Sequence, residues 1–413
     1  MVDSAPNGFR FQTAGFSPNG RYLYYVKYNQ ARNSDYQLIR FDTRTKSERV
    51  LLAPRGRIAD PQISPTGRYI LFFTEDRFLV PKQYRKRMGK YGRRLLYDLK
   101  LKKIVPVDLE LGAKRSSPFS NSYGFQFSSD ESRLYFQTDR LFVGTLSLTE
   151  QQVPALVELT IPTLTYRLVG ERMPDTGGES AFIEYHGSIP PHTRDSILIS
   201  VWGAVDYKGD PAPEYTSLLY MPDGAEAPAP ARGYSFYLFN PISGAISLSG
   251  IPQRTDADLL LTKGCSSPDG RISYQDGSWL RRELGSGSNL EAFPPILYDI
   301  SNSTTSSPVL PEKFSGADEC RLSTTGRYLT VLTRSKTLVK GRGKDNDLFR
   351  IDLTTGEFTP ISTPVLGTLH DGQHTTREIA VSNDARLFAF TSESSRLVSG
   401  DRTVDDLFLV TVK

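Results

Sequence analysis

The fold of this chain is decided by the stretch Ser17-Pro18-Asn19-Gly20-Arg21-Tyr22-Leu23, because the chain contains it several times. Close copies are Ser64-Pro65-Thr66-Gly67-Arg68-Tyr69-Ile70, Ser267-Pro268-Asp269-Gly270-Arg271-Ile272 and Ser323-Thr324-Thr325-Gly326-Arg327-Tyr328-Leu329. Looser copies begin at Ser128 and Ser382. A unit that recurs along a chain indicates a repeat architecture, and repeat architectures commonly provide binding surfaces.

Each copy of the phrase predicts a tight turn followed by a strand. Proline presets φ at the first central position, Asn or Asp tolerates the next, and Gly adopts a positive φ. The runs that follow are short, aromatic and β-branched, as in Tyr22-Leu23-Tyr24-Tyr25-Val26, and such runs predict strands. A second phrase of the type Gln37-Leu38-Ile39-Arg40-Phe41-Asp42 and one more short run complete each unit. Each unit is therefore predicted to be a four-stranded antiparallel meander.

The spacing of the copies is typical of propeller blades, since 47 residues separate Ser17 from Ser64 and 56 separate Ser267 from Ser323. The 139 residues from Ser128 to Ser267 leave room for one blade without a turn phrase. The expected fold is a single-domain, all-β β-propeller with seven four-stranded blades, or with six blades and one large insertion. The predicted blades span residues 9–58, 59–112, 113–176, 177–254, 255–313, 314–366 and 367–413. Residues 1–8 are predicted to help close the last blade, as part of a strand near Val2–Phe11.

The repeated phrases resemble the TolB-type repeats of the broad WD-repeat-like propeller superfamily, over nearly the whole chain. The resemblance implies the propeller fold but no single function, because this architecture supports many unrelated activities. Members of the TolB-type family are often periplasmic, whereas no apolar leader follows Met1. We therefore expect a location in the cytoplasm or in an assembled particle. No run approaches the ~18 apolar residues of a membrane span, so none is expected.

The longest predicted loops follow the second strand of a blade, at residues 74–94, 203–233, 275–294, 333–347 and 391–406. Loops on a rigid scaffold commonly bind partners. Residues 82–94 hold seven basic residues and no acid, although the whole chain has a net charge of only +4. This basic loop predicts an anion-binding site, in which the tyrosines could stack on bases or sugars. Its residues are Lys82, Tyr84, Arg85, Lys86, Arg87, Lys90, Tyr91, Arg93 and Arg94.

The basic loop has a second interpretation as solvated surface outside the strands. A protein or another anionic partner is favoured over nucleic acid, because no recognised nucleic-acid module surrounds the loop.

Metal and cofactor signals are weak. The pair His370 and His374 lies at a spacing that suits a metal only on a helix, and the nearby glycines argue against a helix. Asp401 and Asp405 are weak candidates for calcium, which prefers six or more oxygen ligands. Neither a metal nor a cofactor is expected. The two cysteines, Cys265 and Cys320, are expected to be buried free thiols, since two cysteines make no disulfide framework; a disulfide between them is the alternative.

The search for catalytic motifs finds no Walker loop, dinucleotide fingerprint, zinc pattern or nucleophile elbow. The chain is therefore predicted to be non-enzymatic: a binding or assembly module that presents its loop-decorated face to a protein or polyanionic partner. One alternative is a structural subunit of a larger particle such as a virion, tail or secretion assembly. The other is a glycan-active or lyase-type propeller enzyme.

Overall fold

The computed structural model consists of β-strands and one short 3-10 helix among the residues that it describes. These are residues 9–85, 93–107, 122–128, 130–138, 155–171, 183–184, 197–202, 234–239, 246–248, 259–283, 287–312, 314, 317, 319–333, 347–362, 376–392, 397 and 406–412. The prediction of an all-β chain is confirmed. In this described part, six antiparallel sheets have four strands each and one has three.

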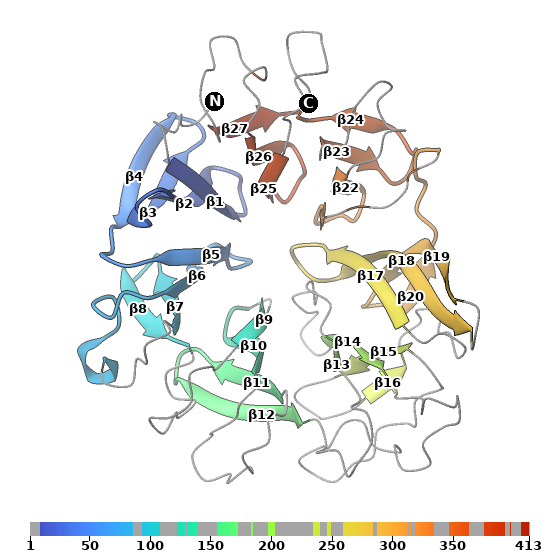
Figure 1. The fold of residues 1–413 in the computed structure, drawn as a ribbon, viewed down its shortest axis with the longest axis horizontal. Helices are drawn as coiled ribbons and strands as arrows, with labels where there is room; N and C mark the ends of the chain where they lie inside the picture. The colour runs from blue at the N-terminus through green and yellow to red at the C-terminus, as the bar shows by residue number, and fades with distance from the viewer. Residues whose placement is uncertain are drawn as a thin grey trace. The chain divides into compact units, whose positions relative to one another are not determined.

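The chain divides into two compact units, Met1–Glu110 with Val309–Lys413, and Leu111–Pro308. The first unit holds four sheets (Figure 1). Their strands are β1 (Phe9–Phe16), β2 (Tyr22–Asn29), β3 (Ser34–Asp42), β4 (Ser47–Leu52); β5 (Ile58–Ile63), β6 (Tyr69–Thr74), β7 (Arg93–Asp98), β8 (Lys103–Pro106); β21 (Glu319–Leu322), β22 (Tyr328–Thr333), β23 (Asp347–Asp352), β24 (Phe358–Pro360); and β25 (Thr376–Val381), β26 (Leu387–Ser392), β27 (Asp406–Thr411). The helix η1 (Lys82–Tyr84) lies between β6 and β7.

The second unit holds the other three sheets, each with the same meander order. Their strands are β9 (Ser122–Phe127), β10 (Arg133–Thr138), β11 (Ala155–Thr160), β12 (Thr165–Glu171); β13 (Ile183–Glu184), β14 (Ile197–Trp202), β15 (Tyr234–Phe239), β16 (Ile246–Leu248); and β17 (Leu259–Ser266), β18 (Ile272–Glu283), β19 (Gly287–Asp299), β20 (Thr304–Ser306). The sheet β13–β16 lies where the blade without a turn phrase was predicted.

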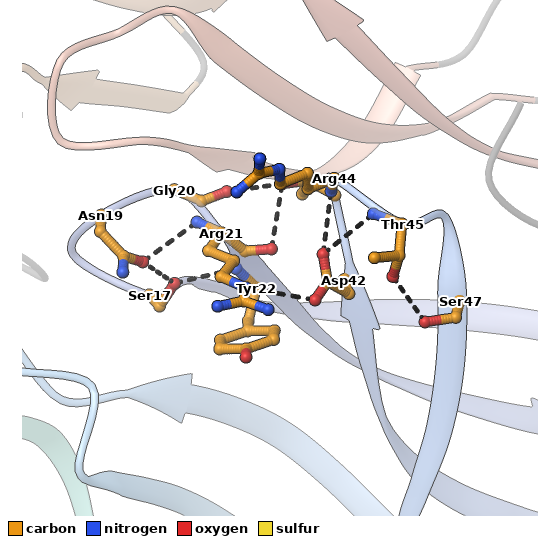
Figure 2. A network of polar contacts seen from close by, with 10 residues as sticks. Ser17, Asn19, Gly20, Arg21, Tyr22, Asp42, Arg44, Thr45 and Ser47 are labelled. Carbon is orange, nitrogen blue, oxygen red and sulfur yellow. Dashed lines mark hydrogen bonds and ion pairs between the residues drawn. The ribbon is translucent and has the colours of Figure 1, made fainter.

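Every copy of the repeated phrase forms the turn between the first and second strands of a sheet, as predicted. In the first copy, the Ser17 hydroxyl donates to Asn19 Oδ1 at 2.8 Å and accepts the amide of Tyr22 at 2.9 Å (Figure 2). Gly20 lies in the left-handed region, with a φ of 68°, and its amide donates to the Ser17 carbonyl. The turn chemistry therefore closes each hairpin locally.

The arginine of the phrase connects this turn to the end of the third strand. Arg21 Nε donates to Asp42 Oδ2 at 3.2 Å, and the same carboxylate accepts the amides of Arg44 and Thr45 (Figure 2). Equivalent pairs recur in three other sheets: Arg68 with Asp98, Arg271 with Asp299, and Arg327 with Asp352. The Arg327 guanidinium donates to Asp352, which lowers the pKa of that carboxyl to about 2. The repeated Arg and Asp of the sequence are thus partners in one structural device.

Three sheets of the first unit pack side by side through their first strands. The strand β1 contacts both β5 and β25 (Figure 1). On one side, Tyr25 of β2 shares a buried apolar cluster with Ala389 of β26 and Leu407 of β27. On the other side, Val26 shares a cluster with Phe72 of β6. This packing places β5 and β25 on either side of β1. The sheet β21–β24 packs on the sheet β25–β27, since Leu332 of β22 and Ile379 of β25 share a buried cluster. The candidate site is built on the first strands β5, β21 and β25.

The structure corrects four expectations. Residues 275–283 and 287–294 do not form a loop: they belong to β18 and β19, which pair with Gly277 opposite Phe293 and Leu280 opposite Leu290. Cross-strand pairing there satisfies the backbone despite the glycines and prolines. Residues 9–11 do not close the last sheet, because they pair with β2, and residues 1–8 lie outside the described residues.

The other two corrections concern side chains. Cys265 and Cys320 are not free thiols, since each is disulfide-bonded. Arg93 and Arg94 do not lie outside the strands, because they begin β7. In the part of the chain that the structure describes, no helix is long and apolar enough to cross a membrane.

Candidate functional site

Three carboxylates occupy one position of the repeat. Asp60, Glu319 and Glu378 each precede the serine of their turn phrase by four residues, counted from Ser64, Ser323 and Ser382. They lie on the first strands β5, β21 and β25 of three sheets in the first unit. The negative charges of Asp60 and Glu319 act on Glu378, so the three groups lie within electrostatic reach of one another. We name them the acidic site.

Backbone irregularities present two of these side chains. Asp60 and Glu378 have φ values of 48° and 50°, in the left-handed region that non-glycine residues seldom adopt. Each lies at a shift of strand register, between Ala59 and Gln62 in β5 and between Arg377 and Ala380 in β25. A β-bulge of this kind redirects a side chain, and bulges are common next to active sites. Strained backbone at two equivalent positions therefore points to function.

Glu378 is the group with the most perturbed ionisation in the acidic site. Surrounding protein atoms displace bulk water and raise its pKa to about 7, and the charges of Glu319 and Asp60 act in the same direction. The backbone amide of Thr13 and the charge of Arg321 oppose the shift. The Glu378 side chain is nevertheless exposed, so solvent reaches it. Glu378 can therefore exchange a proton with a ligand near neutral pH.

The other two carboxylates have cationic partners. Arg94 Nη2 lies 2.9 Å from Asp60 Oδ2, and Arg321 forms an ion pair with Glu319. Among the described residues, no lysine or arginine forms an ion pair with Glu378. An ion pair favours the charged form of a carboxyl, whereas a carboxyl without an ion pair more readily takes the neutral form. The acidic site thus combines two compensated carboxylates with one that can hold a proton.

An aromatic pair lies near Glu378. The rings of Tyr28 and Tyr36 stack with their centroids 5.0 Å apart and an interplanar angle of 4°. Burial raises the pKa of Tyr28, the charge of Arg10 lowers it, and the charge of Glu378 raises it. Tyr28 is half-buried and Tyr36 is buried. A partly open aromatic ring next to a protonatable carboxyl suits a sugar, whose apolar face packs on aromatic rings.

The raised pKa of Glu378 should make stability depend on pH. Between the ordinary value of 4.5 and about 7, the folded state keeps a proton that the unfolded state has released. The free energy of unfolding should therefore fall as pH rises from about 5 to about 8. Because water reaches the side chain, we expect a fall of about 1 kcal/mol, less than for a fully buried group. Urea unfolding at both pH values should show this fall in the wild type and not in Glu378→Gln. An equal fall in both proteins would assign it to other groups.

The predicted basic loop is only partly described. Lys82 and Tyr84 belong to η1, and Arg85 directly follows it. Arg93 is buried, while Arg94 pairs with Asp60 and thereby borders the acidic site. Lys86, Arg87, Lys90 and Tyr91 lie outside the described residues, so their binding role stays a prediction.

The weak metal candidates His370, His374, Asp401 and Asp405 also lie outside the described residues. Within the residues that the structure describes, no group of three or more His, Cys, Asp or Glu could hold a metal ion. The acidic site was missed at the level of sequence. Its signal was present as an acid four residues before the serine in three copies of the phrase.

No protein-family model and no curated protein matches the chain. Solved structures do match along nearly its whole length. An oligogalacturonate lyase from Vibrio parahaemolyticus is 12% identical, with a TM-score of 0.56 over 99% of this chain and 92% of that chain. The β-propeller domain of the Trilobed protease from Pyrococcus furiosus is 13% identical, with a TM-score of 0.51 over 97% and 95%. An acylaminoacyl peptidase from Pyrococcus horikoshii is 14% identical, with a TM-score of 0.52 over 97% of this chain and 51% of that chain.

These similarities confirm the fold as a β-propeller. They also correct the prediction of a non-enzymatic protein, because structures that match this fold include a lyase and peptidases. The absence of known catalytic motifs was therefore a poor reason to predict a non-enzymatic protein. The same fold can carry unrelated activities, and residues from strands distant in sequence can form a site that no local motif marks.

Proposed function

We propose that this chain is a glycan-active propeller enzyme of the lyase or hydrolase type, with Glu378 as its acid–base group. The observation that carries the proposal is the pKa of Glu378, held near 7 on a strained bulge between two other carboxylates. A general acid or base works best when its pKa lies near the operating pH. Strongly perturbed carboxyls of this kind are candidates for catalytic sites.

The surroundings of Glu378 support a sugar as the substrate. The half-buried ring of Tyr28 offers a surface for an apolar sugar face, and Arg321 supplies a nearby positive charge. The overall likeness to an oligogalacturonate lyase adds support for this reaction class, although it concerns the fold.

The two reaction types differ in what Glu378 would do. In an elimination, its carboxylate removes a carbon-bound proton from the sugar, the bond to the leaving oxygen breaks, that oxygen takes a proton from water, and a double bond forms in the ring. In a hydrolysis, its protonated form donates to the leaving oxygen, and water adds to the sugar carbon. Two carboxylates, Asp60 and Glu319, are available to assist either step.

Product analysis tests the proposal. The purified protein should cleave at least one member of a panel of neutral and acidic polysaccharides near neutral pH. Ultraviolet absorbance of an unsaturated sugar end would identify a lyase. Incorporation of oxygen from isotopically labelled water at a new reducing end would identify a hydrolase. Failure to shorten any acidic or neutral polysaccharide, with or without added divalent cations, would count against a glycan-active enzyme.

A further inference from the structure

A second charged surface lies outside the acidic site, around Phe78. This phenyl ring is 51% exposed, which is unusual for so large an apolar side chain. Three guanidinium groups surround it, with their central carbons 5.5, 5.2 and 5.6 Å from the ring centroid for Arg55, Arg77 and Arg85. We name these four residues the Arg-Phe78 surface.

The Arg-Phe78 surface joins two loops through a buried carboxylate. Asp76 Oδ2 accepts the amide of Arg55 at 2.7 Å, and Asp76 Oδ1 accepts the amide of Phe78 at 2.8 Å. The Thr74 hydroxyl accepts the amide of Asp76 at 3.0 Å. A side chain at Gly56 would meet the Asp76 backbone at 3.0 Å, so the two loops approach closely there. The loop between β4 and β5 is thus held against the loop between β6 and β7.

Arg85 holds the second loop in its folded form. Its Nε donates to the Val80 carbonyl at 3.0 Å, and its Nη2 donates to the Phe78 carbonyl at 3.1 Å. Arg55 and Arg77 make no such side-chain bonds among the residues that the structure describes, and their guanidinium groups contact the Phe78 ring. The protein therefore holds the loop around Phe78 in place through Arg85. The guanidinium groups of Arg55 and Arg77 can form hydrogen bonds to a ligand.

The sequence around this surface is rich in basic residues, since residues 77–94 hold eight of them and no acid. Arg94 pairs with Asp60 of β5. The positive charge that the structure places at the surface is that of Arg55, Arg77 and Arg85 around Phe78. Of the two acids just before residue 77, Asp76 is buried and Glu75 lies 4.0 Å from Arg57. An anionic ligand would therefore meet a concentrated positive field.

We propose that the Arg-Phe78 surface binds an anionic polysaccharide, whose carboxylate or sulfate groups pair with Arg55 and Arg77. Guanidinium forks bind such planar or tetrahedral anions through paired, charge-assisted hydrogen bonds. Nucleic acid is the less favoured occupant, because no recognised nucleic-acid module surrounds the surface. The choice of a polysaccharide over an acidic protein rests on the proposed function.

Neighbouring residues connect this surface to the acidic site. The charge of Arg57, in the same loop as Arg55, acts on both Tyr36 and Tyr28. The charge of Glu378 acts on Tyr28 in turn. Asp60 of the acidic site lies on β5, directly after the loop that holds Arg55. A sugar chain bound at the Arg-Phe78 surface would extend toward the acidic site, and the surface would select acidic chains as substrates.

Binding of dextran sulfate, with uncharged dextran of equal length as the reference, tests the proposal by titration calorimetry. The wild type should bind dextran sulfate and not dextran. The double variant Arg55→Gln/Arg77→Gln should raise the Kd about tenfold or more, because two charge-assisted contacts are lost. The control Arg44→Gln/Lys100→Gln removes the same charge from two exposed hairpin turns and should change the Kd by less than about twofold.

Three outcomes would overturn the proposal: equal weakening in both double variants, no binding of dextran sulfate, or tighter binding of oligothymidine or polyglutamate. Binding of dextran sulfate is measured without turnover, so it separates this proposal from the proposed function. The protein could bind dextran sulfate through Arg55 and Arg77 and yet cleave no glycan. That result would contradict only the enzymatic proposal.

Discussion

Replacing Glu378 by Gln should lower kcat on a cleaved polysaccharide by at least about 100-fold, the usual contribution of a general acid or base. Glutamine has the same shape but exchanges no proton, so KM should change little. The pH profile of the wild type should show a limb with an apparent pKa near 7, which is the value raised by the surroundings of Glu378. That limb should be absent from the residual activity of the variant.

A matched control for this experiment is Glu357→Gln, which changes the same group in an exposed turn between β23 and β24. The control should keep the activity of the wild type. Thermal unfolding of both variants checks that neither has lost its fold. If Glu378→Gln keeps more than half of the wild-type kcat, Glu378 is not the acid–base group.

Replacing Asp98 by Ala should lower the free energy of unfolding by about 3 kcal/mol. This carboxylate is 2% exposed. Its Oδ1 accepts the amides of Lys100 and Leu101 at 2.9 and 2.8 Å, and its Oδ2 accepts two bonds from Arg68. Alanine would leave all of these donors without an acceptor. The Arg68 side chain is 42% exposed, so water can take the place of the lost acceptor there. The expected loss of stability is therefore smaller than for a fully buried ion pair.

Asp299 provides the comparison, because it occupies the same position of the repeat in looser geometry. Its carboxylate is 22% exposed and lies 3.9 Å from Arg271. Replacing Asp299 by Ala should therefore cost about 1 kcal/mol. Urea unfolding measures both changes. Equal losses in Asp98→Ala and Asp299→Ala would show that the repeated pair contributes through something other than its burial and hydrogen bonds.

The repeat could be predicted from sequence because its chemistry is local. The Ser17 hydroxyl, the Asn19 side chain and Gly20 lie within four residues, so their spacing alone specifies the turn. The sheet β13–β16 was located without such a phrase, from the 139 residues between Ser128 and Ser267. Prediction failed at residues 275–294, which were expected to be a loop after the second strand. Pairing of β18 with β19 decides the structure there.

The acidic site could not be predicted in the same way. Asp60, Glu319 and Glu378 were visible as residues, but their proximity depends on how separate sheets of the first unit pack on one another. The Thr13 hydroxyl donates to the Glu378 carbonyl across 365 positions of sequence. Neither the pKa of Glu378 nor the left-handed backbone that presents it has a local signature. The basic residues, by contrast, lie close together in the sequence at residues 82–94, and the first prediction of a binding site was based on them.

The amino-acid sequence by itself determined the hairpins, the meander of each sheet and the all-β class. Turn residues and alternating apolar runs act on the backbone within a few positions, so their effect can be predicted from neighbouring residues alone. Only the tertiary structure decided which carboxyl can hold a proton, which arginines surround Phe78, and that Arg93 and Arg94 belong to a strand. Those properties depend on burial and on charges brought together from distant segments, and burial and proximity exist only once the sheets have packed.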